Sequence, residues 1–177
     1  MLASDFAGHP NWSSNRDFCR VHTTLKCAAC GHLHAVDSPQ NLCVKCGRPL
    51  LAEYPLQDLA ERFTPARVRA RRERSLWRFA EVLPVDRLED AVSMGEGMTP
   101  LVGVRGRGPL ADFQRLFVKD ESFNPTGSFK ARGMSAAITR AKALGTRTVV
   151  LPSAGNAGGA AAAYAARAEL DCFVFMP

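Results

Sequence analysis

Two closely matched cysteine pairs constrain the N-terminal part of this chain more strongly than any other feature. Cys27 and Cys30 form the first pair, Cys43 and Cys46 form the second, and a glycine follows each pair. Two thiolates from each pair can converge on one tetrahedral ion, and four thiolates suit zinc. The glycines let the backbone turn tightly around the ion. The sequence therefore predicts a closed, structural zinc site.

Two disulfides or free thiols are the alternatives to a metal site. Disulfides need an oxidising compartment, and nothing in the sequence indicates one. His32, His34 and Cys19 lie near the pairs, but four cysteines already complete a tetrahedral shell. We therefore expect the metal ligands to be Cys27, Cys30, Cys43 and Cys46.

The overall composition is that of an ordinary soluble globular protein. The chain has 177 residues, of which 46% are hydrophobic and 23% are charged. It contains no window of about 18 uninterrupted apolar residues. It also lacks a basic start followed by an apolar run, so no secretory signal is expected. We expect a cytoplasmic protein that has no membrane partner.

The net charge of +6 is concentrated in residues 61–78, where seven arginines stand against two glutamates. A basic stretch of this kind can bind nucleic acid or an acidic ligand. The simpler interpretation, which we favour, is a solvated helix face.

The chain divides into four expected segments. Residues 1–22 are typical of a loose leader, and residues 23–54 hold the cysteine pairs among turn residues, as a zinc-ribbon-like module would. Residues 55–93 are expected to form a helical linker, in which Thr64 caps a helix that begins with proline. Residues 94–177 are expected to form part of an α/β domain.

Strand and helix patterns alternate from Leu116 to the end of the chain. The segments RLFVKDES, RTVVLP and DCFVFMP are typical of short strands, and the segments between them are typical of helices. We expect the first helix to be capped by Ser128 and to stop at Gly145. Its buried face is predicted to contain Met134, Ala137, Ile138 and Ala141. This alternation predicts an α/β fold in which helices pack on a parallel sheet.

Two turns in this region carry groups suited to chemistry. The stretch NPTGSFKARG places Lys130 behind a sharp turn, near the strand ends where α/β sheets bind ligands. The positive end of a helix dipole disfavours the charged amine, and an uncharged lysine can form a Schiff base. An ordinary surface lysine is the alternative.

The second turn, PSAGNAGG, lies between a strand and a helix. Its backbone N–H groups would suit a phosphate or a carboxylate. The alternative is a tight turn in which Ser153 is only the helix N-cap. A dinucleotide site is not expected, because the G-x-G-x-x-G pattern is missing.

Together these motifs resemble those of the fold type II pyridoxal-phosphate enzymes. The segment ESFNPTGSFKARG is similar to their cofactor-lysine motif, and PSAGNAGGAAAAYAARAEL is similar to their S-x-G-N loop and the helix after it. GEGMTPL resembles the motif that precedes both. Within this group, two cysteine knuckles followed by RSLWRFAEVLPV are most similar to the threonine synthases. The resemblance covers nearly all of residues 23–177.

The resemblance implies a tryptophan synthase beta-like domain and assigns roles to its motif residues. Lys130 would hold pyridoxal 5'-phosphate through a Schiff base and would later transfer protons. Phe129 would lie against the cofactor, and Asn156 would hydrogen-bond its phenolic oxygen. The substrate carboxylate would be bound by Ser153, Ala154, Gly155 and Asn156.

The same resemblance implies a reaction and a class of partner. O-phospho-L-homoserine, a small amino-acid substrate, would react with water to give L-threonine and phosphate. The cofactor would serve as the electron sink. Enzymes of this kind are often homodimers.

Two departures from the family pattern leave alternatives open. Threonine synthases usually carry an aspartate after the lysine, where this chain has Ala131. Related dehydratases have apolar residues there, so a threonine or serine dehydratase, or a sulfonate-forming relative, is a second interpretation. The family's glycine-rich phosphate cup comes later than residue 177, so we expect the N-terminal portion of the enzyme. A nucleic-acid-binding zinc ribbon is less favoured, because it leaves the C-terminal half unexplained.

Overall fold

The fold is that of a computed structural model, which describes residues 24–176. The expected leader and Cys19 lie outside the described residues. No helix in the described part combines the length and the apolar character that a membrane span requires.

The cysteine module is a small antiparallel sheet with the strand order β2-β1-β3. Its strands are β1 (Thr24–Cys27), β2 (Leu33–His34) and β3 (Leu50–Glu53). Gly31 and Gly47 have φ values of +71° and +65°. Each donates its N–H to the carbonyl of the first cysteine of its pair, at 3.1 and 2.8 Å. The two knuckles therefore share one turn geometry, and a residue with a side chain would strain it.

The linker contains several short helices rather than one long one. These are α1 (Leu56–Arg62), α2 (Pro65–Ala70), η1 (Leu76–Val82) and η2 (Leu88–Asp90). The Thr64 cap is confirmed, since its hydroxyl accepts the Arg67 N–H at 3.3 Å. Of the seven arginines, Arg71 pairs with Glu81 and Arg78 donates to the Val68 carbonyl. The other five are exposed.

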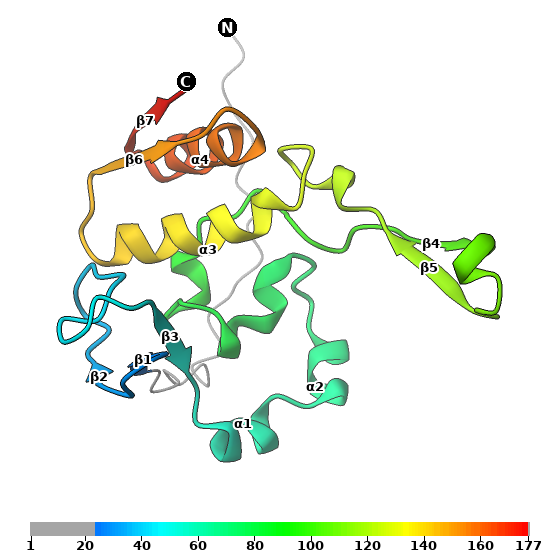
Figure 1. Cartoon of the computed structure of the whole chain (residues 1–177), viewed down its shortest axis with the longest axis horizontal. Helices are drawn as coiled ribbons and strands as arrows, with labels where there is room; N and C mark the ends of the chain where they lie inside the picture. The colour runs from blue at the N-terminus through cyan, green and yellow to red at the C-terminus, as the bar shows by residue number, and fades with distance from the viewer. Residues whose placement is uncertain (1–23, 177) are drawn as a thin grey trace, which may run out of the picture.

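The C-terminal half combines a hairpin with a βαβ unit. The hairpin strands are β4 (Leu101–Val104) and β5 (Leu116–Lys119), with η3 (Gly108–Leu110) between them. The later elements are η4 (Glu121–Phe123), α3 (Lys130–Ala143), β6 (Thr148–Pro152), α4 (Asn156–Ala168) and β7 (Asp171–Phe175). Strands β6 and β7 are parallel, with Val150 opposite Phe173. Figure 1 shows the hairpin extending away from α3 and α4, which lie side by side.

The prediction that residues 116–119 belong to the parallel sheet is wrong. Strand β5 pairs antiparallel with β4, with Leu101 opposite Lys119. A hairpin partner lies close along the chain and needs no crossover, whereas a parallel partner does. The structure is therefore a mixed α/β fold, in which, among the strands of residues 24–176, only β6 and β7 are parallel.

The buried face of α3 also differs from the predicted one. Ala131, Ser135, Ile138 and Thr139 are buried, whereas Ala137 is exposed. The two hydroxyls turn inwards because both meet the backbone of Val92, at 2.8 Å in each case. Around them lies the main apolar cluster, whose buried members are Val92, Ala131, Ile138, Tyr164, Ala165 and Ala168.

The end of α3 follows its predicted signal, whereas its start lies one residue later than predicted. The N-cap is Phe129 rather than Ser128, although the Ser128 hydroxyl still accepts the Lys130 N–H at 3.3 Å. Gly145, with φ +76°, ends the helix, because its N–H and that of Thr146 turn back to the carbonyls of Lys142 and Ala141. The stop is a local signal, so the sequence alone could place it.

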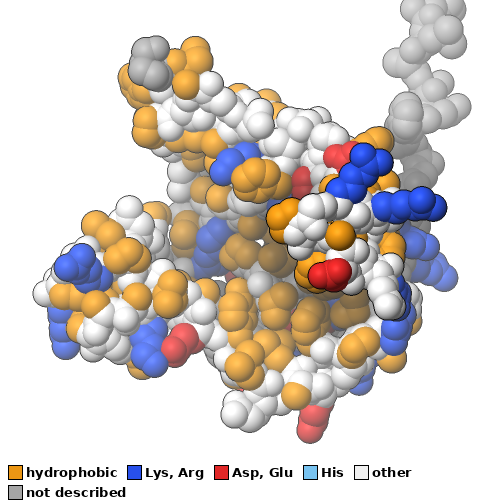
Figure 2. Space-filling view, turned by 45° about the vertical axis from the view of Figure 1, so that its right-hand side comes forward, with side chains coloured by type: hydrophobic (Ala, Val, Ile, Leu, Met, Phe, Trp, Pro, Cys, Tyr) orange, Lys and Arg blue, Asp and Glu red, His pale blue; other side chains and the backbone are white. Residues whose placement is uncertain are grey.

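Apolar side chains reach the surface on both two-stranded sheets. Leu101 in the hairpin and Phe175 in β7 are 62% and 64% exposed. Figure 2 shows such side chains spread over one face of the molecule. Large exposed apolar areas commonly mark contact surfaces.

Two adjacent glycines in α4 provide a test of this packing. A Cβ at Gly158 would lie 2.9 Å from Cγ1 of Val174 and 3.3 Å from Ser153, whereas a Cβ at Gly159 would meet nothing within 4 Å. We expect Gly158→Ala to lower the free energy of unfolding by about 1–3 kcal/mol through overpacking. Gly159→Ala, the matched control, should raise it by about 0.5–1 kcal/mol, because alanine favours the helix. Urea unfolding measures both, and equal effects would contradict the described packing.

Candidate functional site

The four predicted cysteines lie together at one end of the module. Their sulfur atoms all lie within 4.8 Å of one another. The Sγ atoms of Cys27 and Cys46 are 3.4 Å apart, and those of Cys30 and Cys43 are 3.6 Å apart. A disulfide needs about 2.05 Å, and all four thiols are free. Zinc–sulfur bonds of about 2.3 Å in a tetrahedron place sulfurs about 3.8 Å apart, so this donor set fits one zinc ion.

Backbone N–H groups surround the two inner sulfurs. Ala29 and Cys30 direct their N–H groups at Cys27 Sγ, and Lys45 directs its N–H at Cys43 Sγ, each at 3.4 Å. Hydrogen bonds of this kind favour thiolates over thiols, which is the form that binds a metal. In the described part of the chain, neither His32 nor His34 belongs to the cluster.

Lys130 stands at the first residue of α3, directly after the sharp turn. Gly127, with φ +68°, closes that turn by donating its N–H to the Asn124 carbonyl at 2.8 Å. The Lys130 amine lies 4.5 Å from the centre of the Phe129 ring, and Phe129 is 58% exposed. Nearby, the Thr126 hydroxyl is buried, with no partner among the described residues. This end of the helix therefore offers an amine, an exposed ring and an unsatisfied hydroxyl.

The second predicted turn connects β6 to α4. The helix begins at Asn156, with Gly155 as N-cap. The Ser153 hydroxyl accepts the Gly158 N–H at 2.9 Å from two residues before this cap, so the simpler alternative, in which Ser153 is itself the N-cap, is wrong. Ala154, Gly155 and Asn156 are exposed. The N–H groups of Asn156 and Ala157, the first two residues of the helix, lie before the first turn is closed, so they remain suited to an anion.

The two turns lie at the same end of the βαβ unit. Figure 1 shows that the N-terminal ends of α3 and α4 lie together, at the end where β6 finishes. Because α3 starts at Lys130 and α4 at Asn156, the fold brings both predicted motifs to the carboxyl end of a parallel strand. Ligands commonly bind at this end of α/β sheets.

A buried carboxylate that the sequence analysis missed lies behind these helix ends. Glu96 is fully buried. It accepts hydrogen bonds from Tyr164 OH at 2.7 Å, Ser135 Oγ at 2.5 Å and the Met94 N–H at 3.0 Å, and Ser93 Oγ lies at 3.2 Å. We call these residues the Glu96 network. The only sequence signal was a glutamate inside GEGMTPL, and glutamate is rarely buried.

Tyr164 and Trp77 are the two aromatic residues that donate hydrogen bonds within this network. Burial, followed by the hydrogen bond and the charge of Glu96, raises the pKa of Tyr164 well above its usual value, so the hydroxyl remains a donor. The Trp77 indole donates to Ser135 Oγ at 2.9 Å. The network therefore joins η1, α3, α4 and the loop before β4.

A second carboxylate fixes the start of α3. Arg132 donates two hydrogen bonds to Glu121, at 2.6 and 2.8 Å, and Thr99 Oγ1 donates a third at 2.6 Å. Asn124 Nδ2 lies 3.0 Å from the same carboxylate. The hydrogen bonds of Arg132 above all hold the pKa of Glu121 at about 2.

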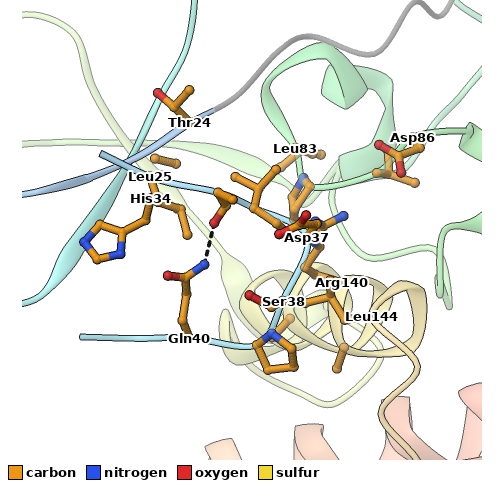
Figure 3. Close-up of a pocket in the computed structure, with 18 of the residues that line it drawn as sticks. Thr24, Leu25, His34, Asp37, Ser38, Gln40, Leu83, Asp86, Arg140 and Leu144 are labelled. Atoms are coloured by element: carbon orange, nitrogen blue, oxygen red, sulfur yellow. Dashed lines mark hydrogen bonds between the residues drawn. The ribbon is translucent and has the colours of Figure 1, made fainter. Parts of the chain in front are cut away.

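A separate cavity of about 700 Å³ lies between the cysteine module and the C-terminal half of α3. Figure 3 shows His34, Asp37 and Gln40 of the module among the residues that line it, together with Arg140 from α3 and Leu144 just after that helix. Arg140 also donates to the Val36 carbonyl. None of the predicted site residues lines this cavity, so it is distinct from both the cysteine cluster and the Lys130 region.

Comparison with known proteins finds a family match in the C-terminal half and relatives that match over a longer part of the chain. Residues 92–177 match the family described as pyridoxal-phosphate dependent enzyme. The threonine synthase of Methanocaldococcus jannaschii is 38% identical over 152 residues, which is 86% of this chain and 37% of that protein. The threonine synthase of Methanosarcina acetivorans is 35% identical over 153 residues, with 86% and 36% covered. That of Halalkalibacterium halodurans is 43% identical over 113 residues, with 58% and 30% covered. The chain therefore spans between 30% and 37% of the length of these relatives.

The Glu121–Arg132 pair should make the free energy of unfolding depend on pH in the acid range. A carboxyl group whose pKa is lowered in the folded state stabilises the protein above its unfolded pKa. That contribution is lost as the pH falls from about 4.5 to about 2. We expect Glu121→Gln to lower the free energy of unfolding at pH 7 by about 1–3 kcal/mol. The difference from wild type should shrink across this pH window in urea titrations.

Glu89→Gln is the matched control. Glu89 also forms an ion pair, with Arg87, but its side chain is 62% exposed. An exposed pair contributes about 0–1 kcal/mol. A Glu121→Gln deficit that stayed constant from pH 7 to pH 2 would contradict the assignment.

Proposed function

We propose, from the homology of this chain to threonine synthases, that it is the N-terminal portion of a pyridoxal-phosphate-dependent lyase of the threonine synthase type. The observation that carries the proposal is the position of Lys130. It is the first residue of α3, inside the part of the chain that matches the pyridoxal-phosphate family. It lies at the same end of the βαβ unit as the loop that starts α4.

The residues around Lys130 fit this cofactor. An aldehyde needs an accessible amine, which Lys130 supplies at a half-buried position beside an exposed ring. The buried Thr126 hydroxyl, in the turn before Lys130, lacks a partner among the described residues and so leaves one polar group for a ligand to satisfy. When bound, the cofactor supplies an electron-withdrawing ring to the chemistry.

The chain's own residues would position the reactants and move protons. Lys130 would hold the cofactor covalently and would then accept or donate a proton at Nζ. Phe129 would pack against the cofactor, and the Asn156 amide would donate to its phenolic oxygen. Exposed N–H groups at the start of α4 would bind the substrate carboxylate, with Ser153, Ala154 and Gly155 forming the loop. The Ser153 hydrogen faces only a 3.4 Å contact to the Gly155 carbonyl, so it is available to a ligand.

We propose O-phospho-L-homoserine and water as the substrates, and L-threonine and phosphate as the products. Ala131, the residue that departs from the usual aspartate, is fully buried in the cluster with Ile138 and Tyr164. Its side chain therefore contributes packing, and an aspartate there would bury a charge among apolar groups. This packing role supports the proposal, because it accounts for the alanine without invoking the substrate of a dehydratase.

We also propose that the four cysteines bind one structural zinc ion. The sulfur spacings and the surrounding N–H groups support it, and a closed four-thiolate shell leaves no position for a substrate. Reduced thiols also favour the cytoplasm as the compartment.

A nucleic-acid-binding role for the module finds little support. Trp77, which stands beside the arginine stretch, is only 1% exposed and donates its indole hydrogen to Ser135. A buried indole cannot stack on a base, so Trp77 does not supply the aromatic platform that single-strand binding uses.

The proposed covalent role of Lys130 can be tested on the full polypeptide that carries this sequence. Incubation with pyridoxal phosphate, borohydride reduction and peptide mapping should place the label on Lys130. We expect Lys130→Arg to lose at least tenfold of the label and to abolish phosphate release from O-phosphohomoserine. Lys142→Arg, on an exposed position of the same helix, should change neither. Labelling spread evenly over several lysines would contradict the proposal, and 2-oxoacid formation from threonine without phosphate release would point to a dehydratase.

The zinc proposal predicts one equivalent of zinc per chain by elemental analysis after zinc loading and desalting. Cys30→Ser should lose most of that metal, because it removes one of four thiolates. Cys172→Ser is the control, since this free cysteine lies outside the cluster. Equal zinc content in all three proteins, or none in the wild type, would exclude the site.

A further inference from the structure

We propose that Glu96 is a positioning residue that sets the mutual placement of α3 and α4, and so of Lys130 and the loop 153–156. This inference rests on the proposed function, because it concerns the same site. Glu96 itself touches neither motif. It would act through Ser135 on α3 and Tyr164 on α4, which both bond its carboxylate.

Each helix gives the carboxylate one short hydrogen bond. Ser135 Oγ lies 2.5 Å from Oε1 and 2.8 Å from the Val92 carbonyl, and its one hydrogen takes the shorter contact, to Oε1. Tyr164 OH donates to Oε2 at 2.7 Å. Ser135 is 0% exposed, as are Glu96 and Tyr164. A carboxylate held between two hydroxyls in a dry interior fixes both distances closely, because misplacing either donor leaves a buried charge under-satisfied.

The network lies one to two turns behind the proposed site. Ser135 is five residues beyond Lys130, which corresponds to about 7.5 Å along a helix axis, and Tyr164 is eight residues beyond Asn156, or about 12 Å. A rotation of either helix at the network would therefore move the motif residues at its N-terminal end. Apolar contacts alone would allow such rotation more readily, because they are not directional.

Gly97, the residue after Glu96, connects the same loop to the turn before Lys130. Gly97 donates its N–H to Asn124 Oδ1 at 3.0 Å, and Asn124 begins the NPTG turn. Gly97 has φ +111°, and a Cβ there would lie 2.8 Å from the Leu76 nitrogen. The segment is therefore tightly held, and it contacts α3, α4 and the turn at once.

Substitutions can separate a positioning role of Glu96 from a purely structural one. Glu96→Gln keeps the side-chain shape but replaces one acceptor oxygen by a donor group, which then faces a hydroxyl. Ile138→Val is the matched control, because it weakens the packing of the same helix and leaves every hydrogen bond of the network in place. Glu61→Gln, at an exposed position, controls for the loss of charge.

The experiment measures the rate at which pyridoxal phosphate and borohydride label Lys130 in the full polypeptide. It also measures amide hydrogen exchange in residues 131–136. We expect Glu96→Gln to slow labelling at least tenfold and to speed exchange at least tenfold, while both controls stay within twofold of wild type. Tyr164→Phe removes one bond to Glu96 and should slow labelling at least threefold, so it decides the question if Glu96→Gln does not fold.

The inference would be overturned if Glu96→Gln and Ile138→Val had the same rate of Lys130 labelling and the same rate of amide exchange. A wild-type protein that is not labelled at Lys130 would instead count against the proposed function. In that case the exchange rates still decide whether Glu96 positions the helix. The two failures are therefore distinguishable.

Discussion

The buried carboxylate of Glu96 is the interaction on which the C-terminal half depends. Its four hydrogen-bonding neighbours come from its own loop, from α3 and from α4, and Trp77 joins them through Ser135. Burying a charge is costly unless its hydrogen bonds are complete. The loop and both helices must therefore reach their places together, and the two motif-bearing helix ends are placed by the same event.

The cysteine module depends on a different constraint. Its described residues contain only two buried apolar side chains, Cys27 and Cys43, and both belong to the sulfur cluster. So small a core cannot offset the entropy of ordering the chain. A bound ion would supply that stability. The module contacts the rest of the molecule through polar links, such as those from Tyr54 to Val82 and from Arg140 to Val36.

Local features of the fold could be predicted from the sequence, and long-range ones could not. The cysteine turns, the Thr64 cap and the Gly145 stop depend on a few neighbouring residues. The partner of β5 and the buried face of α3 depend on segments far along the chain. The same holds for Glu96, because a glutamate between two glycines indicates an exposed loop until Ser135 and Tyr164 are known to face it. The roles of the Lys130 and Ser153 motifs came from family resemblance, since their residues alone left a surface lysine and an N-cap open as alternatives.

A crystal structure of the full polypeptide grown with pyridoxal phosphate tests the account most directly. The account predicts continuous density from Lys130 Nζ into the cofactor, with the Asn156 amide within hydrogen-bonding distance of the phenolic oxygen. It also predicts that Glu96 remains bonded to Ser135 and Tyr164. Cofactor density elsewhere, for example in the cavity beside Arg140, or a Lys130 side chain directed into solvent, would contradict it.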